Sequence, residues 1–150
     1  MTRNQTELTY LRAEARSTSS VKLVIILYDL LIGALTDAVA ALSKNAIEER
    51  SKEVKRAFLV LEQMEGSLDT EAGGEAARNL ARFYATLRVN IMNAHVQASR
   101  TIFERQIQML FQVRNAWASV EAQHAAGKTS SLNQHELERE GKPLPANWIA

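Results

Sequence analysis

Cysteine is absent from the 150-residue sequence, which excludes disulfide scaffolds, thiolate metal sites and cysteine nucleophiles. Proline occurs only at Pro143 and Pro145, so a long preceding region contains no proline that would interrupt a helix. The formal net charge is +1, which gives no overall field to attract nucleic acid or an anionic membrane. Phosphate loops, dinucleotide fingerprints and nucleophile elbows are also missing. These absences favour a helical binding protein over an enzyme.

The composition fits one globular domain. Apolar residues are 46% and charged residues 23% of the chain, close to the averages for soluble domains, and this length is enough to bury one core. The first twenty residues carry charges and lack the apolar run of a secretory signal. The most apolar stretch, residues 23–35, is interrupted by Asp29 and is too short to span a hydrocarbon core of about 30 Å. We therefore expect a cytoplasmic protein, located in the cytosol, without membrane insertion.

Helical spacing of apolar residues begins after a pair of serines. Ser19 or Ser20 can cap free backbone amides, so a first helix is predicted from there to about Leu42. A turn at residues 43–45 follows. Asn45 with Glu48 three residues later resembles a capping box, which predicts a second helix ending near Leu68. Its expected buried stripe is Val54, Phe58, Leu61 and Leu68.

Two further helices are predicted downstream. Residues 69–74 combine turn formers with acids suited to the positive end of a helix dipole, so the third helix should start there. After a break near residues 97–101, a fourth helix follows, with Gln106 as the one polar member of its stripe. The third stripe is Ala77, Leu80, Tyr84, Leu87, Ile91 and Ala94, and the fourth is Phe103, Leu110, Val113, Trp117 and Val120.

Four long helices with short connections predict an all-α fold, an antiparallel four-helix bundle. We expect an N-terminal arm at residues 1–16, the bundle at residues 17–123 and a polar, disordered tail at residues 124–150. Within the tail, residues 127–131 have the composition of a linker, and residues 132–139 could form a brief helix.

The first predicted helix is apolar on more than one face. A bundle helix normally needs a single apolar stripe, but three stripes overlap here until Leu31. Three interpretations remain open: an open groove for an apolar helix or peptide, a homodimer interface, or deeper burial than in the other helices. The third of these stripes is Leu23, Ile26 and Leu30.

Three ordered motifs resemble the signature of the flagellin export chaperones, the FliS family. The first lies in residues 17–32 and contains Lys22-Leu23 followed by Leu27-Tyr28-Asp29. The second contains Ser67-Leu68-Asp69, Gly73-Gly74-Glu75, Ala77, Asn79-Leu80 and Tyr84, and the third is Val113-Arg114-Asn115-Ala116-Trp117. The resemblance runs in register from about residue 17 to residue 120. The chain departs from the family pattern at Ser20, Leu30, Thr86 and Leu87.

The resemblance implies a non-enzymatic export chaperone without a cofactor or metal. It would bind the C-terminal helical segment of flagellin, prevent premature polymerisation and assist delivery to the flagellar type III export apparatus. An export gate component and a homodimer of the client-free protein are further partners that the resemblance allows, and Tyr10 would cover part of the groove when no client is bound. The partner-binding residues implied are Tyr10, Ile26, Tyr28, Asn79, Leu80, Phe83 and Tyr84.

Rival functions have weaker support. Glu121-x-x-His124 has the spacing of a metal ligand pair, but the second pair and the inward carboxylates of a dinuclear centre are missing. Asp29 lies among apolar residues, and we expect it to be buried and hydrogen-bonded rather than catalytic. Arginines at positions 78, 82, 88 and 100 occur in a stretch without acids, yet aromatic residues for base stacking are not interleaved with them. We therefore expect neither a metal site nor nucleic acid binding.

Overall fold

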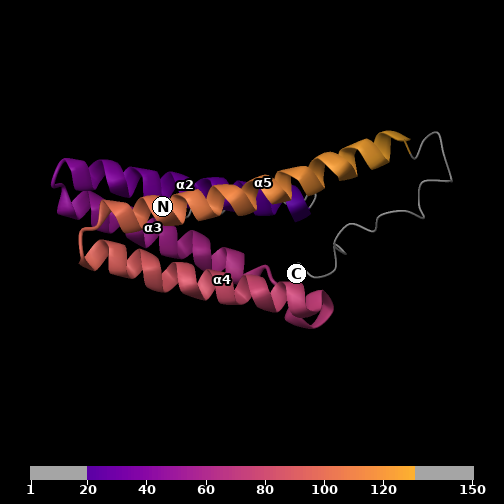
Figure 1. The fold of residues 1–150 in the computed structure, drawn as a ribbon, viewed down its shortest axis with the longest axis horizontal. Coiled ribbons are helices and arrows are strands. Elements are labelled where there is room, and N and C mark those ends of the chain that lie inside the picture. The colour runs from indigo at the N-terminus through magenta and orange to yellow at the C-terminus, as the bar shows by residue number, and fades with distance from the viewer. Residues whose placement is uncertain (1–19, 131–150) are drawn as a thin grey trace, which may run out of the picture.

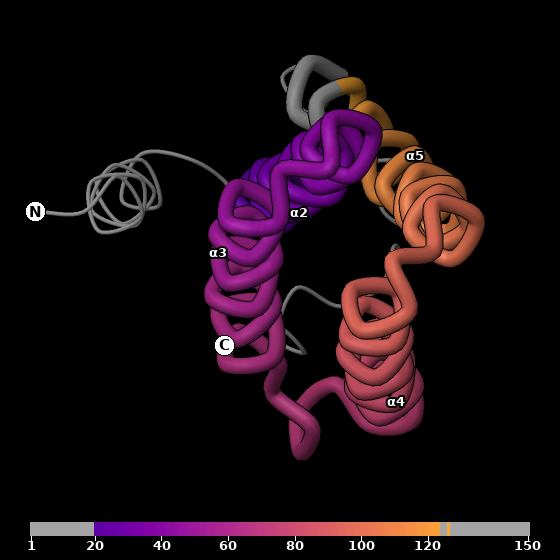
Figure 2. Tube along the Cα trace, turned by 90° about the vertical axis from the view of Figure 1, so that its left-hand side faces the viewer, coloured from indigo at the N-terminus to yellow at the C-terminus, as the bar shows by residue number. Residues whose placement is uncertain are grey.

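The computed structural model describes residues 20–130 and, within them, leaves the side chains of residues 124, 125 and 127–130 aside. Its helices are α2 (Ser20–Ser43), α3 (Ile47–Gly66), α4 (Thr70–Val96) and α5 (Arg100–Ser130). Helix α2 packs against α3 and α5, and α4 packs against the same two helices (Figures 1 and 2). Connections of three residues force each helix back along the previous one. The predicted four-helix bundle is confirmed, while Tyr10, the arm and residues 131–150 lie outside the described residues.

The turn between α2 and α3 forms where it was predicted, but by another device. Asn45 adopts a left-handed backbone conformation with φ 56°, which asparagine tolerates better than most residues. The Ala46 N–H then donates to the Ala41 carbonyl at 2.9 Å and closes the end of α2. Helix α3 starts after Ala46, and no side chain caps it. The predicted capping box of Asn45 and Glu48 is therefore wrong, because Asn45 ends one helix instead of starting the next.

Helix α4 begins with a side-chain cap and a glycine kink. The Asp69 carboxylate accepts hydrogen bonds from the Glu71 N–H at 3.1 Å and the Ala72 N–H at 3.0 Å. Gly74 then interrupts the helical backbone with φ 59° and ψ −137°, a combination open mainly to glycine. The predicted start within residues 69–74 is confirmed, and Gly74 is the reason that the first turn of α4 differs in direction from the rest.

Helix α5 continues further than expected. A linker was predicted at residues 127–131, but the helix runs to Ser130. Glycine lowers helix stability by only about 1 kcal/mol relative to alanine, and no proline occurs before Pro143, so Gly127 does not end the helix. Figure 1 shows that the C-terminal part of α5 extends beyond the other three helices.

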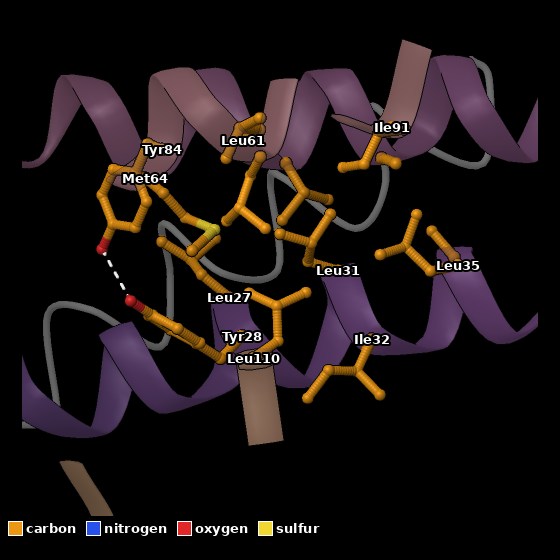
Figure 3. Packing of buried hydrophobic residues seen from close by; sticks show 14 of the residues in the cluster. Leu27, Tyr28, Leu31, Ile32, Leu35, Leu61, Met64, Tyr84, Ile91 and Leu110 are labelled. Atoms are coloured by element: carbon orange, nitrogen blue, oxygen red, sulfur yellow. Dashed lines mark hydrogen bonds between the residues drawn. The ribbon is translucent and has the colours of Figure 1, made fainter. Parts of the chain in front are cut away.

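The core lies along α2. Leu31, Ala34, Leu35 and Ala38 of this helix are completely buried, and Figure 3 shows its side chains packed beneath residues of α3 and α4. Helix α2, with 24 residues, is also long and apolar enough to cross a membrane by length and composition. Core helices pass the same test, and here the apolar residues of α2 contact α3 and α5.

Candidate functional site

A chain of three aromatic side chains crosses one end of the core. The hydroxyl groups of Tyr28 on α2 and Tyr84 on α4 are hydrogen-bonded at 3.0 Å, as Figure 3 shows. Their rings meet edge to face, with centroids 6.3 Å apart. Trp117 on α5 forms a second hydrogen bond with Tyr28. Since Tyr28 and Tyr84 are 0% and 2% exposed, both of these predicted contact residues lie inside the bundle in this structure.

The polar atoms of this network are adapted to a dry environment. Burial raises the pKa of Tyr84 well above its ordinary value, and the neighbouring Tyr28 adds to the effect. Burial also raises the pKa of Tyr28, although its hydrogen bonds with Tyr84 and Trp117 oppose the rise. Both hydroxyls therefore stay neutral and hydrogen-bonded across the physiological pH range. The arrangement fixes the relative position of three helices and offers no nucleophile to a substrate.

A small cavity adjoins the network. Val24 and Leu27 of α2, Met64 of α3, and Tyr84 and Trp117 line it together with the residues 67–68 that connect α3 to α4. Its accessible volume is about 10 Å³, which is roughly the space of one water molecule. This cavity is too small for a cofactor or a substrate.

Ile26 lies at the edge where α2 meets α3. The Arg56 guanidinium of α3 donates to the Asp37 carboxylate of α2 at 3.0 Å, and Ile26 precedes Asp37 by eleven residues, or about three helical turns, on the same side of α2. Ile26 is half-buried. We call this edge the α2–α3 strip; its apolar members are Leu23, Ile26 and Leu30 of α2 and the exposed Leu59 of α3.

Asn79, Leu80 and Phe83 lie on the other side of the molecule. The Asn90 amide of α4 donates to the Gln106 side chain of α5 at 3.2 Å, and Phe83 precedes Asn90 by seven residues, so it faces the same edge. Leu80 and Phe83 are half-buried against the core, whereas Asn79 is exposed and hydrogen-bonded to Arg82. We call this edge the α4–α5 strip; its apolar members are Ala76, Leu80 and Phe83 of α4 and Val113 and Val120 of α5.

The predicted contact residues therefore do not form a single surface. Ile26 belongs to the α2–α3 strip, while Leu80 and Phe83 belong to the α4–α5 strip on the opposite edge of the bundle (Figure 2). Tyr28 and Tyr84 connect these edges through the core. The apolar spacing of the sequence predicted Val113 and Val120 only as core positions and did not indicate Ala76. The seven-residue repeat that links Ala76 to Phe83, and Val113 to Val120, is the signal that could have identified the strip.

The extra apolar faces of α2 are covered by neighbouring helices to different degrees. The buried bulky apolar residues of α2 are Val21, Val24, Leu27, Tyr28, Leu31, Ile32 and Leu35. Its remaining bulky apolar residues are half-buried, with none among the exposed large side chains of the described residues. Deeper burial thus accounts for most of the apolar excess. The third stripe keeps partial exposure at the α2–α3 strip.

Asp29 does not have the environment that was expected. Its carboxylate is 50% exposed and accepts two hydrogen bonds from the Arg114 guanidinium of α5, at 2.9 and 3.3 Å. The helical position of Asp29 places it on the outer side of α2, facing α5 rather than the core. The expectation of a buried Asp29 is wrong, and its hydrogen bond instead joins α2 to α5. Lys22 and Glu121 form a second ion pair between these helices at 3.7 Å.

Metal binding and nucleic acid binding gain no support from the described residues. Among the residues whose side chains are described, no group of three or more potential metal ligands occurs. His124 is not one of these residues, and Glu121 is paired with Lys22. The arginines of the acid-free stretch are paired with carboxylates: Arg78 and Arg82 with Glu75, Arg88 with Glu65 and Arg100 with Glu104. Such pairs lower the positive potential that a nucleic acid phosphate would meet.

Comparison with known proteins agrees with this architecture. The family described as "Flagellar protein FliS" matches residues 2–124. The flagellar secretion chaperone FliSB of Pseudomonas aeruginosa is 24% identical over 86 residues, which cover 57% of this chain and 68% of that protein. The family match includes α2, α3, α4 and the part of α5 up to residue 124, so residues 125–150 lie beyond it. The chain belongs to the FliS family of flagellar proteins.

Proposed function

We propose that this protein is a cytosolic, non-enzymatic flagellar secretion chaperone whose client is the C-terminal helical segment of flagellin. Binding would keep that segment from polymerising early and assist its delivery to the export apparatus, where a gate component is the next partner. Family membership over residues 2–124 and the name of the Pseudomonas relative support the secretion role. The α4–α5 strip is the observation that carries the choice of an apolar helical client.

The α4–α5 strip has the properties of a helix-docking surface. Leu80, Phe83 and Val113 are half-buried, so they are held by the core but keep apolar area that a partner can cover. The polar residues beside them on α4 are the uncharged Asn79 and Thr86, both exposed. An amphipathic helix can place its apolar face on such a surface without burying an unpaired charge.

The α2–α3 strip provides a second surface of the same kind. Ile26 and Leu30 are half-buried there, and Leu59 is 38% exposed. Because the two strips lie on opposite edges, a client that contacts both has to pass around one end of the bundle. A segment that folds as it binds can do so, since its helices are joined by flexible chain. The homodimer is the alternative use of either strip.

Tyr28 and Tyr84 have an indirect role in this proposal. Their hydroxyl pair and the hydrogen bond from Trp117 fix α2, α4 and α5 relative to one another. Phe83 packs against Tyr84 with ring centroids 5.9 Å apart. The buried tyrosines would thus hold Phe83 in place for client contact, and Tyr10 would cover part of the same surface in the client-free protein.

Calorimetric titration with the C-terminal segment of flagellin tests this proposal. The native segment should bind saturably with a negative heat-capacity change, and a version with serine at its apolar positions should not bind. Phe83→Ser should weaken binding by about 2- to 10-fold, because only the exposed part of this half-buried side chain is left for a client to cover, at about 25 cal/mol per Å². Phe111→Ser is the matched control, because Phe111 is 46% exposed on α5 and outside both strips.

Each outcome separates two interpretations. Equal binding by the native and serine-substituted segments would refute apolar capture. Binding that Phe83→Ser and Ile26→Ser leave unchanged would refute the assignment of the strips. Sedimentation of the client-free protein decides whether a homodimer occupies them, and an increase in client affinity on Tyr10→Ala would support the covering role of Tyr10.

A further inference from the structure

The outer side of α4 carries a second, solvent-facing repeat. Seven exposed residues follow one another in steps of three and four, the spacing that keeps side chains on one face of a helix. The first half of this face is charged and the second half is apolar. Its members are Glu75, Arg78, Arg82, Ala85, Val89, Met92 and Val96. We call it the outer face of α4.

The apolar half is more exposed than is usual for such side chains. Val89, Met92 and Val96 are 58%, 45% and 75% exposed. Ile47, at the start of α3, is 62% exposed and lies at the same end of the bundle, because the Arg50 side chain one turn further donates to His95 at 3.2 Å. Neighbouring exposed apolar residues of this kind commonly mark an interaction site.

The charged half has an excess of positive charge. Glu75 accepts hydrogen bonds from Arg78 and from Arg82, both at 2.9 Å, so one carboxylate serves two guanidinium groups. From residue 76 to residue 103 the sequence contains no acid. An acidic segment is therefore a suitable partner for this half of the outer face.

Residues 131–150 have the complementary order of properties. Residues 136–140 contain three glutamates and one arginine, and Leu144, Trp148 and Ile149 follow. This segment lies beyond the family match, which covers residues 2–124, so the family's common features do not explain it.

The position of the α5 end allows this segment to reach the outer face. The hydrogen bond between Asn90 and Gln106 sets the antiparallel register of α4 and α5. At 1.5 Å per residue, Arg78 then lies about 18 Å, and Met92 about 39 Å, back along the bundle axis from Ser130. An extended chain of eighteen residues, from Ser130 to Trp148, spans up to about 60 Å. The acids would meet the arginines first, and the apolar residues would reach the apolar half.

We propose that residues 131–150 bind to the outer face of α4 of the same molecule. The glutamates of residues 136–140 lie beside Arg78 and Arg82, and Trp148 covers Met92 and its apolar neighbours. The contact shields the apolar end of α4 from solvent and from other proteins. It leaves the α2–α3 and α4–α5 strips free, so it is independent of client binding.

Methyl NMR of the full-length protein tests this contact. The chain has four methionines, so selective methyl labelling gives a simple spectrum in which Met92→Leu identifies the Met92 signal. A nuclear Overhauser effect between the Trp148 indole and the Met92 methyl is expected, together with a shift of that methyl in Trp148→Ala. Val96→Ser should reduce the effect, whereas Phe111→Ser, at a similarly exposed position on α5, should not. An unshifted Met92 signal in Trp148→Ala would overturn the proposal.

Isotope mixing distinguishes the same molecule from a second copy. When labelled and unlabelled chains are mixed, an effect that appears between chains or grows with concentration would overturn the intramolecular contact. Replacement of the three glutamates of residues 136–140 by glutamine should weaken the contact. The population with the segment bound to the outer face of α4 should fall by about 1.5- to 5-fold for each exposed ion pair lost. The matched variant R139Q/K142Q should leave it unchanged or raise it. The opposite ranking would overturn the charge assignment.

Discussion

Removal of single hydroxyl groups from the buried aromatic network should have unequal effects. Tyr28 is the middle member, hydrogen-bonded to both Tyr84 and Trp117. Tyr84→Phe removes one hydrogen bond and leaves Tyr28 with Trp117 as its partner. Tyr28→Phe removes both hydrogen bonds and leaves the Tyr84 hydroxyl buried without its partner. Tyr28→Phe should therefore destabilise the bundle more.

The magnitudes follow from the cost of one buried hydrogen bond. A net loss of about 0.5–1.5 kcal/mol is expected for Tyr84→Phe, and about 1–3 kcal/mol for Tyr28→Phe, because Tyr28→Phe removes two hydrogen bonds instead of one. The double variant should cost little more than Tyr28→Phe alone, since the shared hydrogen bond can be lost only once. With a typical urea dependence of about 1–3 kcal/mol per molar, these differences are measurable as shifts of the unfolding midpoint.

Urea unfolding followed by tryptophan fluorescence is the appropriate assay. Trp148→Phe leaves Trp117 as the one tryptophan, and Trp117 is 5% exposed in the folded protein, so its emission reports the network directly. Circular dichroism of the same samples checks that helices and tryptophan environment are lost together. The reasoning is refuted if Tyr84→Phe costs as much as Tyr28→Phe, or if the two effects are additive.

The same network predicts a loss of stability in alkali. Burial raises the pKa of Tyr84 and of Tyr28 above the ordinary value of 10.0, so the folded state favours the neutral phenols. This contribution is fully present below the unfolded pKa and is lost as the pH rises above it. Urea midpoints should fall between pH 9 and pH 11, and the fall should be smaller in the Y28F/Y84F variant.

Three other perturbations test local features of the bundle by urea or thermal unfolding. Gly74→Ala should lower the free energy of unfolding by about 1–3 kcal/mol because φ is 59° there. Gly33 lies inside α2 with nothing within 4 Å of an added methyl group, so Gly33→Ala should raise the free energy of unfolding by about 0.5–1 kcal/mol. Equal effects of the two substitutions would contradict the role of Gly74 in the kink. Asp69→Ala should lower the free energy of unfolding by about 1 kcal/mol because it removes the α4 cap. Asp69→Ser should keep most of this stabilisation, because the serine hydroxyl can also cap the helix. Burial, and secondly the Arg50 charge, lower the pKa of His95 below its ordinary value of 6.5. The free energy of unfolding should therefore fall as the pH drops below 6.5. If a His95→Gln variant loses the same stability over this pH range, His95 is not the cause.

The site was only partly predictable from the sequence. The third helical stripe identified Tyr84 as a core residue, and the family resemblance suggested the same residue as a contact. The sequence could not decide between these two roles, because the position that faces the core and the position that faces a partner can share one stripe. Asp29 shows the same limit. Its apolar sequence neighbours suggested burial, but its side chain points to Arg114 of a distant helix.

The sequence by itself determined the helices, their order and the bundle. Apolar spacing, the Asp69 cap and the lack of early prolines are local properties, and short connections leave few ways to pack four helices. The tertiary structure decided which apolar residues stay half-exposed. That depends on contacts such as Arg56 with Asp37 and Asn90 with Gln106, which set the rotation of each helix against residues far away in the chain.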